Sequence, residues 1–318
     1  MLKVILWVLG ILSLGLMSFA VYFCYEFFRL PSLKLSPDMP RAAMAETVDE
    51  WARRLQQERK FNGIILIIRD GEPVLAEGFG VTGHLRDKQL TTASSMRIAS
   101  LSKQFTAAAI LTLVDNEQLS LDDSISKHIQ NFPYPEVKIR HLLTQTSGIP
   151  DAYIQLASEH EADIDVLTNE RVVQIIAKSD LPLESRPGDN FTYSNTNYVL
   201  LAHIVETVSG LSLEAYLEKT LFIPLHMENT RIWNLVSERA PGPNHTTGFN
   251  IYDDDPVSSE EKPGFLDGVS GDGAVHTSAN DMVLWNRFWI DGAGLISSEL
   301  IADAQSGTVL SAGMTSTY

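Results

Sequence analysis

The chain has 318 residues, of which 44% are hydrophobic and 20% are charged, with 20 glycines and 14 prolines. This balance is typical of a globular protein and excludes collagen-like repeats and long disordered tracts. The 40 acidic and 24 basic residues give a formal net charge of -16, which argues against a nucleic-acid partner. The single cysteine, Cys24, excludes an intrachain disulfide and a multi-thiolate metal site, and we expect neither a metal nor another cofactor.

The N-terminal stretch from Val4 to Tyr25 carries no charge and is long enough to cross a bilayer as a helix. Residues 1–25 are therefore interpreted as an uncleaved membrane anchor, or as a signal peptide cleaved near Ala20. Positive charges lie on both sides of the stretch and do not fix its orientation. We expect a membrane-anchored protein with an extracytoplasmic domain in the periplasm or at the cell surface, or a secreted protein after cleavage. Prolines in residues 26–40 predict an extended linker.

The next segments predict a helix followed by a hairpin. Residues 41–60 place four apolar side chains on one helical face, namely Met44, Val48, Trp51 and Leu55. Residues 63–68 and 73–80 then read as two antiparallel strands, because the Asp-Gly pair between them supplies the positive φ of a tight turn. The first strand is apolar on both faces, so we expect helices on both sides of the sheet.

From Ser100 onward the pattern is mostly helical. Helices are predicted over 100–116, 139–146, 169–179, 195–209 and 213–221, and a final helix over 278–289. Between the last two, residues 241–273 are rich in Gly, Pro and acidic residues and predict long surface loops.

An S-x-x-K tetrad, Ser100 to Lys103, opens the first of these helices. Positions i and i+3 share a helical face, so the lysine amine can approach the serine hydroxyl and take its proton. Two further tetrads, 124–127 and 259–262, match the same spacing, but they lie in polar or acidic segments rather than at the front of an apolar helix. The spacing alone leaves two interpretations of Ser100 open, a helix cap and a nucleophile.

A second motif, Tyr193-Ser194-Asn195, enters the helix predicted at 195–209. A phenol and an amide two positions apart can be aimed at one site, where the phenol shuttles a proton and the amide holds a substrate carbonyl. By itself, Tyr193 is more typical of a packed aromatic residue whose hydroxyl is satisfied.

Taken together, the motifs resemble the serine β-lactamase-related hydrolases, nearest the branch of class C β-lactamases, DD-peptidases and esterases. Matching segments follow one another in the family's order at 96–106, 139–150 and 191–198, and more weakly at 224–230 and 271–282. The resemblance implies a fold of the α/β class, α+β type: an antiparallel sheet flanked by helices, with a helical subdomain over roughly 106–270 of a domain spanning 41–318.

The resemblance also implies roles for four residues and a class of substrate. Ser100 would be the acylated nucleophile, Lys103 its activating partner, Tyr193 a second acid or base, and Asn195 a ligand of the substrate carbonyl. The implied activity is hydrolysis of an amide or ester, whether a β-lactam, a D-amino-acid peptide or a simple ester. The alternatives are a membrane-tethered, non-catalytic binding protein of the same fold and an inactive fragment.

The sequence departs from the family at its third motif, K-T-G or H-x-G. Residues 262–264 read Lys-Pro-Gly but precede the segment that the motif follows in the family, and His276-Thr277-Ser278 lacks the glycine. We therefore expect the sheet to be incomplete, the chain to be truncated at its C-terminus, and the 318-residue form to be weakly active or inactive for lack of one oxyanion donor. No G-x-S-x-G elbow and no H-E-x-x-H zinc motif is present in the sequence.

Overall fold

The computed structural model describes residues 30–83, 88–160, 165–233, 240–249 and 264–316. The uncharged segment Val4 to Tyr25, the cleavage site near Ala20 and Cys24 lie outside these ranges, as does the tetrad at 259–262. The chain divides into two compact units, Met1–Asn62 and Gly63–Tyr318. The boundaries predicted for the anchor, the linker and the helical subdomain stay predictions.

The first unit contains helix α2, Arg41–Gln57, which confirms the helix predicted there. Residues 30–40 before it have no regular secondary structure apart from a turn. The helix buries Met44, Val48, Ala52 and Leu55, so the predicted apolar face is correct except that Ala52 takes the place of Trp51. The indole of Trp51 is half-buried and its Nε1 donates to the carbonyl of Pro31 at 2.7 Å.

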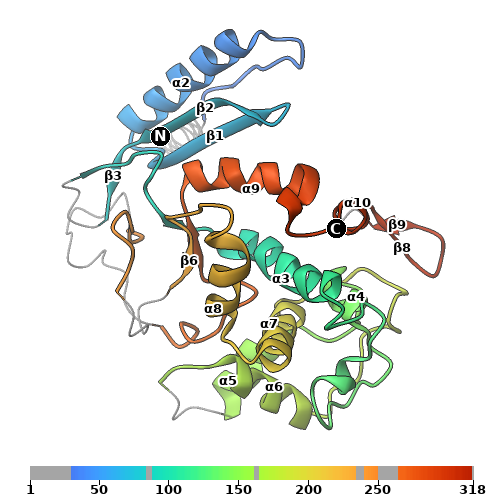
Figure 1. Ribbon diagram of the computed structural model, residues 1–318. Helices are drawn as coiled ribbons and strands as arrows, with labels where there is room; N and C mark the ends of the chain where they lie inside the picture. Colours follow the sequence, from blue (N-terminus) through green and yellow to red (C-terminus); the bar gives the residue numbers. More distant parts are fainter. Residues whose placement is uncertain (1–29, 84–87, 161–164, 234–239, 250–263, 317–318) are drawn as a thin grey trace, which may run out of the picture. The chain divides into compact units, whose positions relative to one another are not determined.

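The second unit begins with the predicted hairpin, β1 (Gly63–Arg69) and β2 (Glu72–Phe79), which pair antiparallel. Asp70 and Gly71 have φ values of 55° and 76°, the positive pair that a two-residue hairpin turn requires. Helix α9, Ala279–Asp291, contacts both strands and lies beside the hairpin in Figure 1. A cover on the other face of this sheet stays a prediction.

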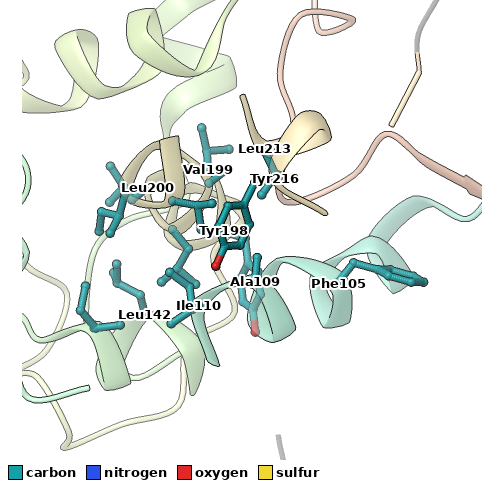
Figure 2. Packing of buried hydrophobic residues seen from close by; sticks show 14 of the residues in the cluster. Phe105, Ala109, Ile110, Leu142, Tyr198, Val199, Leu200, Leu213 and Tyr216 are labelled. Carbon is teal, nitrogen blue, oxygen red and sulfur yellow. The ribbon is translucent and has the colours of Figure 1, made fainter. Parts of the chain in front are cut away.

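The helices that follow the hairpin surround one hydrophobic core. At its centre are α3 and α7, and Figure 2 shows Ala109 and Ile110 of α3 beside Tyr198 of α7. Both helices are apolar on nearly every side because other helices cover them. The helices of this unit are α3 (Lys103–Asp115), α4 (Ile139–Leu143), α5 (Tyr153–His160), α6 (Asn169–Lys178), α7 (Asn195–Ser209), α8 (Leu213–Leu217), α9 and α10 (Ser298–Ala304), with shorter turns η1 (Ala99–Ser102), η2 (Ile125–Lys127), η3 (Glu218–Phe222) and η4 (Gly292–Gly294).

Short strands complete the unit. The strands β5 (Met96–Arg97), β7 (Val275–Thr277) and β6 (Arg231–Ile232) form an antiparallel sheet in that order. Two small hairpin pairs are β3 (Val81–Thr82) with β4 (Lys88–Gln89), and β8 (Thr308–Val309) with β9 (Thr315–Ser316). The predicted combination of helices with antiparallel strands is therefore confirmed, and the strands form several small sheets. Strand β5 leads directly into η1 and α3, so the three-stranded sheet fixes where that helix starts.

Four expectations about these elements need correction, the last of them an omission. The helix predicted at 100–116 is two pieces, a 3-10 turn over η1 and then α3, and the helix predicted at 278–289 is followed by α10. The loop predicted over 241–273 is not all surface, because Asp267 and Val269 are 5% and 4% exposed. Helix α5 was not predicted, because an isolated helix of two turns leaves a weak periodic pattern.

Within the ranges that the structure describes, no single helix combines the length and apolar character that a bilayer crossing needs. Those criteria are met only by α7 taken together with Leu213–Phe222, a pair that bends by 72° at its break.

Candidate active site

The four residues singled out from the sequence lie together at the start of α3. Ser100 is in η1, Lys103 is the first residue of α3, and Tyr193 and Asn195 lie where the chain enters α7. The Ser100 Oγ is 3.3 Å from Lys103 Nζ and 3.0 Å from the Tyr193 hydroxyl, and Lys103 Nζ donates to Asn195 Oδ1 at 2.8 Å. The structure thus joins two motifs that lie far apart in the sequence.

The Ser100 hydroxyl does not cap a helix. Neither η1 nor α3 has a side-chain hydrogen bond at its N-cap, and Ser100 is exposed to solvent. Tyr193 is 40% exposed, so it is not a buried packing residue. Neither structural interpretation that the sequence left open, a helix cap for Ser100 or a buried packing role for Tyr193, therefore fits these side chains.

Lys103 is the buried member of the group, with 3% of its surface exposed. Its Nζ makes a third hydrogen bond, to the backbone oxygen of Asp272 at 2.9 Å. The rings of Tyr193 and Tyr198 lie 5.0 and 5.7 Å from Nζ. Three acceptors match the three N–H groups of an ammonium, and the aromatic faces add a favourable environment for its charge.

The backbone before Ser100 is held by strand β7. Ile98 N donates to Val275 O at 3.0 Å, and Val275 N donates to the buried hydroxyl of Ser102 at 3.1 Å. Between these contacts, Ala99 has a φ of 47°, a left-handed conformation that costs an alanine about 1 kcal/mol or more. A residue in such a conformation directly before Ser100 turns the chain sharply from β5 into η1.

Gln145 holds the loop that carries Tyr193. The buried side chain of Gln145 accepts from Ser194 N at 3.0 Å and from Asn197 Nδ2 at 2.6 Å through Oε1, and its backbone oxygen accepts from Thr192 N at 2.8 Å. Ser147 adds a hydrogen bond to Asn197 Oδ1 at 2.7 Å. Segment 139–150, which matched the family in sequence, therefore has the structural task of positioning the Tyr193 loop.

Asp151 orients the amide of Asn195. Its Oδ2 accepts from Asn195 Nδ2 at 3.0 Å and its Oδ1 accepts from the backbone N–H of Thr196 at 3.2 Å, in the first turn of α7. A carboxylate at a helix N-terminus is favoured by the helix dipole. With Nδ2 directed to Asp151, the Asn195 oxygen faces Lys103, and one of the two amide N–H groups stays free for a ligand.

A half-buried carboxyl group belongs to Asp272, the residue whose backbone oxygen Lys103 contacts. Asp272 Oδ2 accepts a hydrogen bond from the Tyr153 hydroxyl at 2.9 Å. Burial raises the pKa of Asp272 above the ordinary value, while the Tyr153 bond and the charge of Lys103 act against the rise. Burial, together with the adjacent Asp272, raises the pKa of the Tyr153 phenol, which therefore stays protonated. Sequence reasoning missed Asp151, Tyr153 and Asp272; the only signal was that segment 271–282 matched the family.

The other residues considered from the sequence do not join this site. Lys127 pairs with Asp123 at 2.9 Å, and the hydroxyl of Ser124 donates to Pro135 O, so the second tetrad makes no serine–lysine contact. His276 lies in β7, where its ring packs against Trp233 and His245. In the described part of the chain, no three His, Cys, Asp or Glu side chains cluster as a metal site would require.

Comparison with known proteins supports a family assignment. The Beta-lactamase family model matches residues 48–318. Penicillin-binding protein 4* of Bacillus subtilis is 32% identical over 240 residues, which cover 73% of this chain and 53% of that protein. A D-aminopeptidase of Gluconobacter oxydans is 27% identical over 228 residues, which cover 71% of this chain and 42% of that protein. This chain thus spans about half the length of these relatives.

Solved structures give the same result for the fold. The octameric penicillin-binding protein homologue from Pyrococcus abyssi matches with a TM-score of 0.67 and 29% identity, over 83% of this chain and 60% of that one. This agreement confirms the β-lactamase/transpeptidase-like fold that the motifs predicted. By sequence and by fold, the chain belongs to the Beta-lactamase family.

Proposed function

We propose that this protein is a serine hydrolase that forms an acyl-enzyme at Ser100 with an amide or ester substrate. One observation carries the proposal: the exposed Ser100 Oγ has Lys103 Nζ at 3.3 Å and the Tyr193 hydroxyl at 3.0 Å. An amine and a phenol within reach of one hydroxyl provide a base to activate it and an acid to protonate a leaving group.

The reaction begins when Lys103 is neutral, because only then can Nζ accept a proton. The Ser100 proton passes to Nζ as Oγ attacks the substrate carbonyl, and the resulting tetrahedral centre collapses when the bond to the leaving group breaks. The Tyr193 hydroxyl donates its proton to that leaving nitrogen or oxygen and is reprotonated through Lys103. Water then repeats the attack on the ester at Ser100 and releases the acid product.

Asn195 has the geometry to bind the substrate rather than to move protons. Its Oδ1 is engaged by Lys103 and its Nδ2 by Asp151, so a single N–H is available for a substrate carbonyl. For the substrate we propose the amide and ester classes expected from the sequence: β-lactams, D-amino-acid peptides and simple esters. The penicillin-binding protein 4* and D-aminopeptidase relatives support the first two classes.

Covalent labelling tests the proposal. The 318-residue protein is incubated with a fluorescent penicillin, a D-amino-acid p-nitroanilide and a p-nitrophenyl ester, and the labelled peptide is identified by mass spectrometry. We expect the adduct on Ser100, formed slowly because one oxyanion donor is expected to be missing, and its loss in Ser100→Ala. Ser124→Ala is the matched control, because it removes the serine of the other described S-x-x-K tetrad and should label as the wild type does.

Labelling that persists in Ser100→Ala would refute the proposal. A protein that binds the same probes reversibly, with equal affinity in wild type and Ser100→Ala, would instead be the non-catalytic binding protein considered as the alternative.

We further propose that residues 1–25 anchor the protein in a membrane with its catalytic domain outside the cytoplasm. The support is the uncharged length of Val4 to Tyr25. Flotation with lipid vesicles tests this: the full chain should float, and a chain lacking residues 1–29 should stay in the aqueous fractions.

A further inference from the structure

Asp151 orients Asn195 but keeps part of its own carboxyl group open to solvent. The residue is exposed and lies two positions before the start of α5. Its Oδ2 accepts from Asn195 Nδ2 at 3.0 Å, and its Oδ1 accepts from the backbone N–H of Thr196 at 3.2 Å and from the Thr196 hydroxyl at 3.5 Å. Two carboxylate oxygens provide about four acceptor positions, so Oδ2 can accept a further hydrogen bond.

The charge of Asp151 is not balanced by a neighbouring cation. In the described part of the chain, no lysine, arginine or histidine lies within ion-pair distance of its carboxyl group, whereas the exposed Asp122 pairs with a lysine and an arginine. Lys103 is separated from Asp151 by the amide of Asn195 and gives its N–H groups to other acceptors. The solvent side of the site therefore presents a carboxylate without a partner of opposite charge.

This carboxylate lies close to the reacting position. Asp151 Oδ2 contacts Asn195 Nδ2, the oxygen of the same amide contacts Lys103 Nζ, and Nζ lies 3.3 Å from Ser100 Oγ. One amide and one amine thus separate Asp151 from the nucleophile, and both Ser100 and Asp151 are exposed. A substrate that reaches Ser100 and accepts from the free N–H of Asn195 also comes within reach of Asp151.

We propose that Asp151 binds a positively charged amine on the acyl part of the substrate, so that the preferred substrates are amides or esters of amino acids with a free amino group. An α-ammonium lies two bonds from the carbonyl carbon that Ser100 attacks, and its N–H groups donate to Asp151 Oδ2. Charge-assisted hydrogen bonds of this kind are about twice as strong as neutral ones. The formal net charge of -16 acts in the same direction, because a negative protein attracts cationic ligands. This inference rests on the proposed function, in which Ser100 is acylated.

The acylation rates of two nearly isosteric substrates test the proposal. D-phenylalanine p-nitroanilide carries the ammonium, and D-phenyllactic acid p-nitroanilide carries a neutral hydroxyl group in its place. The ratio of the two rates is compared between the wild type and Asp151→Asn, which cancels the difference in intrinsic reactivity between the substrates. The preference for the amine substrate should fall by about tenfold or more in the variant, because the substrate loses a hydrogen bond to a charged group.

Glu159→Gln is the matched control. Glu159 is an exposed residue of α5 whose Oε1 accepts from Gln155 at 2.9 Å, so the variant removes the same unit of negative charge without touching Asn195. Its ratio of rates should equal that of the wild type. If Asp151 served only to orient Asn195, Asp151→Asn would slow both substrates by the same factor, and that unchanged ratio would overturn the inference.

A binding measurement does not depend on acylation. The affinities of Ser100→Ala for D-phenylalanine amide and D-phenyllactic acid amide are measured by isothermal titration calorimetry. The amine ligand should bind about tenfold more tightly, and the difference should vanish when Asp151→Asn is added. Equal affinities in Ser100→Ala, or no measurable binding of either compound, would overturn the inference. If no probe labels Ser100 in the wild type but the amine preference is present, the proposed function fails while the role of Asp151 stands.

Discussion

Lys103 carries the largest energetic demand in the candidate site. Burying an amine costs several kcal/mol unless its hydrogen bonds are replaced, and Lys103 finds replacements in Ser100 Oγ, Asn195 Oδ1 and Asp272 O. In this arrangement Ser100 accepts from both Lys103 and Tyr193, so the serine proton points elsewhere. In the proposed mechanism, the hydrogen bond between Lys103 Nζ and Ser100 Oγ must reverse its direction before Ser100 is activated.

The hydroxyl of Tyr193 can be tested without disturbing its ring. Tyr193→Phe keeps the aromatic face 5.0 Å from Lys103 Nζ but removes the donor to Ser100 and to the leaving group. We expect the acylation rate to fall by a factor of about 100 to 10,000, the usual contribution of a general acid or base. Stopped-flow measurement with an activated ester gives the rate.

Tyr198→Phe serves as the control for this change. The Tyr198 ring also lies near Lys103, at 5.7 Å, but its hydroxyl donates to the carbonyl of Leu143 rather than to Ser100. The acylation rate of Tyr198→Phe should stay within a few-fold of the wild-type rate. Equal losses in the two variants would show that packing around Lys103, and not the Tyr193 hydroxyl, sets the rate.

At the scale of elements, the segment from Gly268 to Val275 connects the helices to the sheet beneath the site. The carbonyl oxygens of Gly271 and Asp272 accept hydrogen bonds from Thr106 and Lys103 of α3. Asn169 of α6 donates to the Ser270 hydroxyl, and the last residue of the segment, Val275, begins β7. Gly271 makes this possible: its φ is 103°, and it passes so close to α7 that a Cβ would lie 2.4 Å from the carbonyl of Tyr198.

Gly271→Ala should therefore destabilise the protein. The added methyl group would also meet Ala202 Cβ at 2.6 Å, and neither the helix backbone nor Ala202 can yield. Steric conflict and the unfavourable φ together should lower the free energy of unfolding by about 3 kcal/mol. Urea denaturation followed by circular dichroism measures the loss.

Gly273→Ala provides the comparison two residues further on. A Cβ there meets no atom within 4 Å, so the free energy of unfolding should change by about 1 kcal/mol or less. If both alanine variants were equally stable, the close approach of this segment to α7 would be wrong.

At the scale of the whole molecule, stability should depend on pH through a buried histidine. His276 lies in β7, the central strand of its sheet, with its ring 4.9 Å from that of His245 and 5.7 Å from that of Trp233. Burial, followed by the nearby His245, lowers the pKa of His276 to about 4. The unfolded chain, with an ordinary histidine pKa near 6.5, binds the proton first as the pH falls.

The free energy of unfolding should consequently decrease between pH 6.5 and pH 4, by about 3 kcal/mol from His276 alone. Burial also lowers the pKa values of His141 and His203, which adds to the loss in the same direction. His276→Phe retains a packed ring without the titrating group, so its free energy of unfolding should depend less steeply on pH. Urea denaturation of both proteins at a series of pH values measures this dependence.

His226→Asn is the control for that slope. His226 is exposed and has a φ of 58°, which asparagine tolerates, so the variant removes an imidazole without changing the backbone. Its pH dependence should match the wild type. If the free energy of unfolding of His276→Phe fell with pH as steeply as that of the wild type, His276 would not be the source of the pH dependence.

The sequence by itself determined the secondary-structure elements and the two site residues that lie close together along the chain, Ser100 and Lys103. The hairpin follows from the Asp-Gly turn between apolar strands, and α6 and α7 begin at the residues that their patterns indicate. Ser100 and Lys103 meet because three positions along a helical turn bring side chains to one face. Tyr193 and Asn195 were placed beside them through the order of matched family segments.

Only the tertiary structure decided the rest of the site. Asp151 contacts Asn195, Asp272 contacts Lys103, and Tyr153 contacts Asp272, in each case across distant segments, and no periodic pattern records such contacts. For the same reason, the sequence did not predict that Gly271 packs closely against α7, because the segment around it has the polar composition of a loop. Short-range spacing follows from backbone geometry, whereas long-range contacts depend on how the helices pack around their shared core, which is set by the sum of many weak apolar interactions.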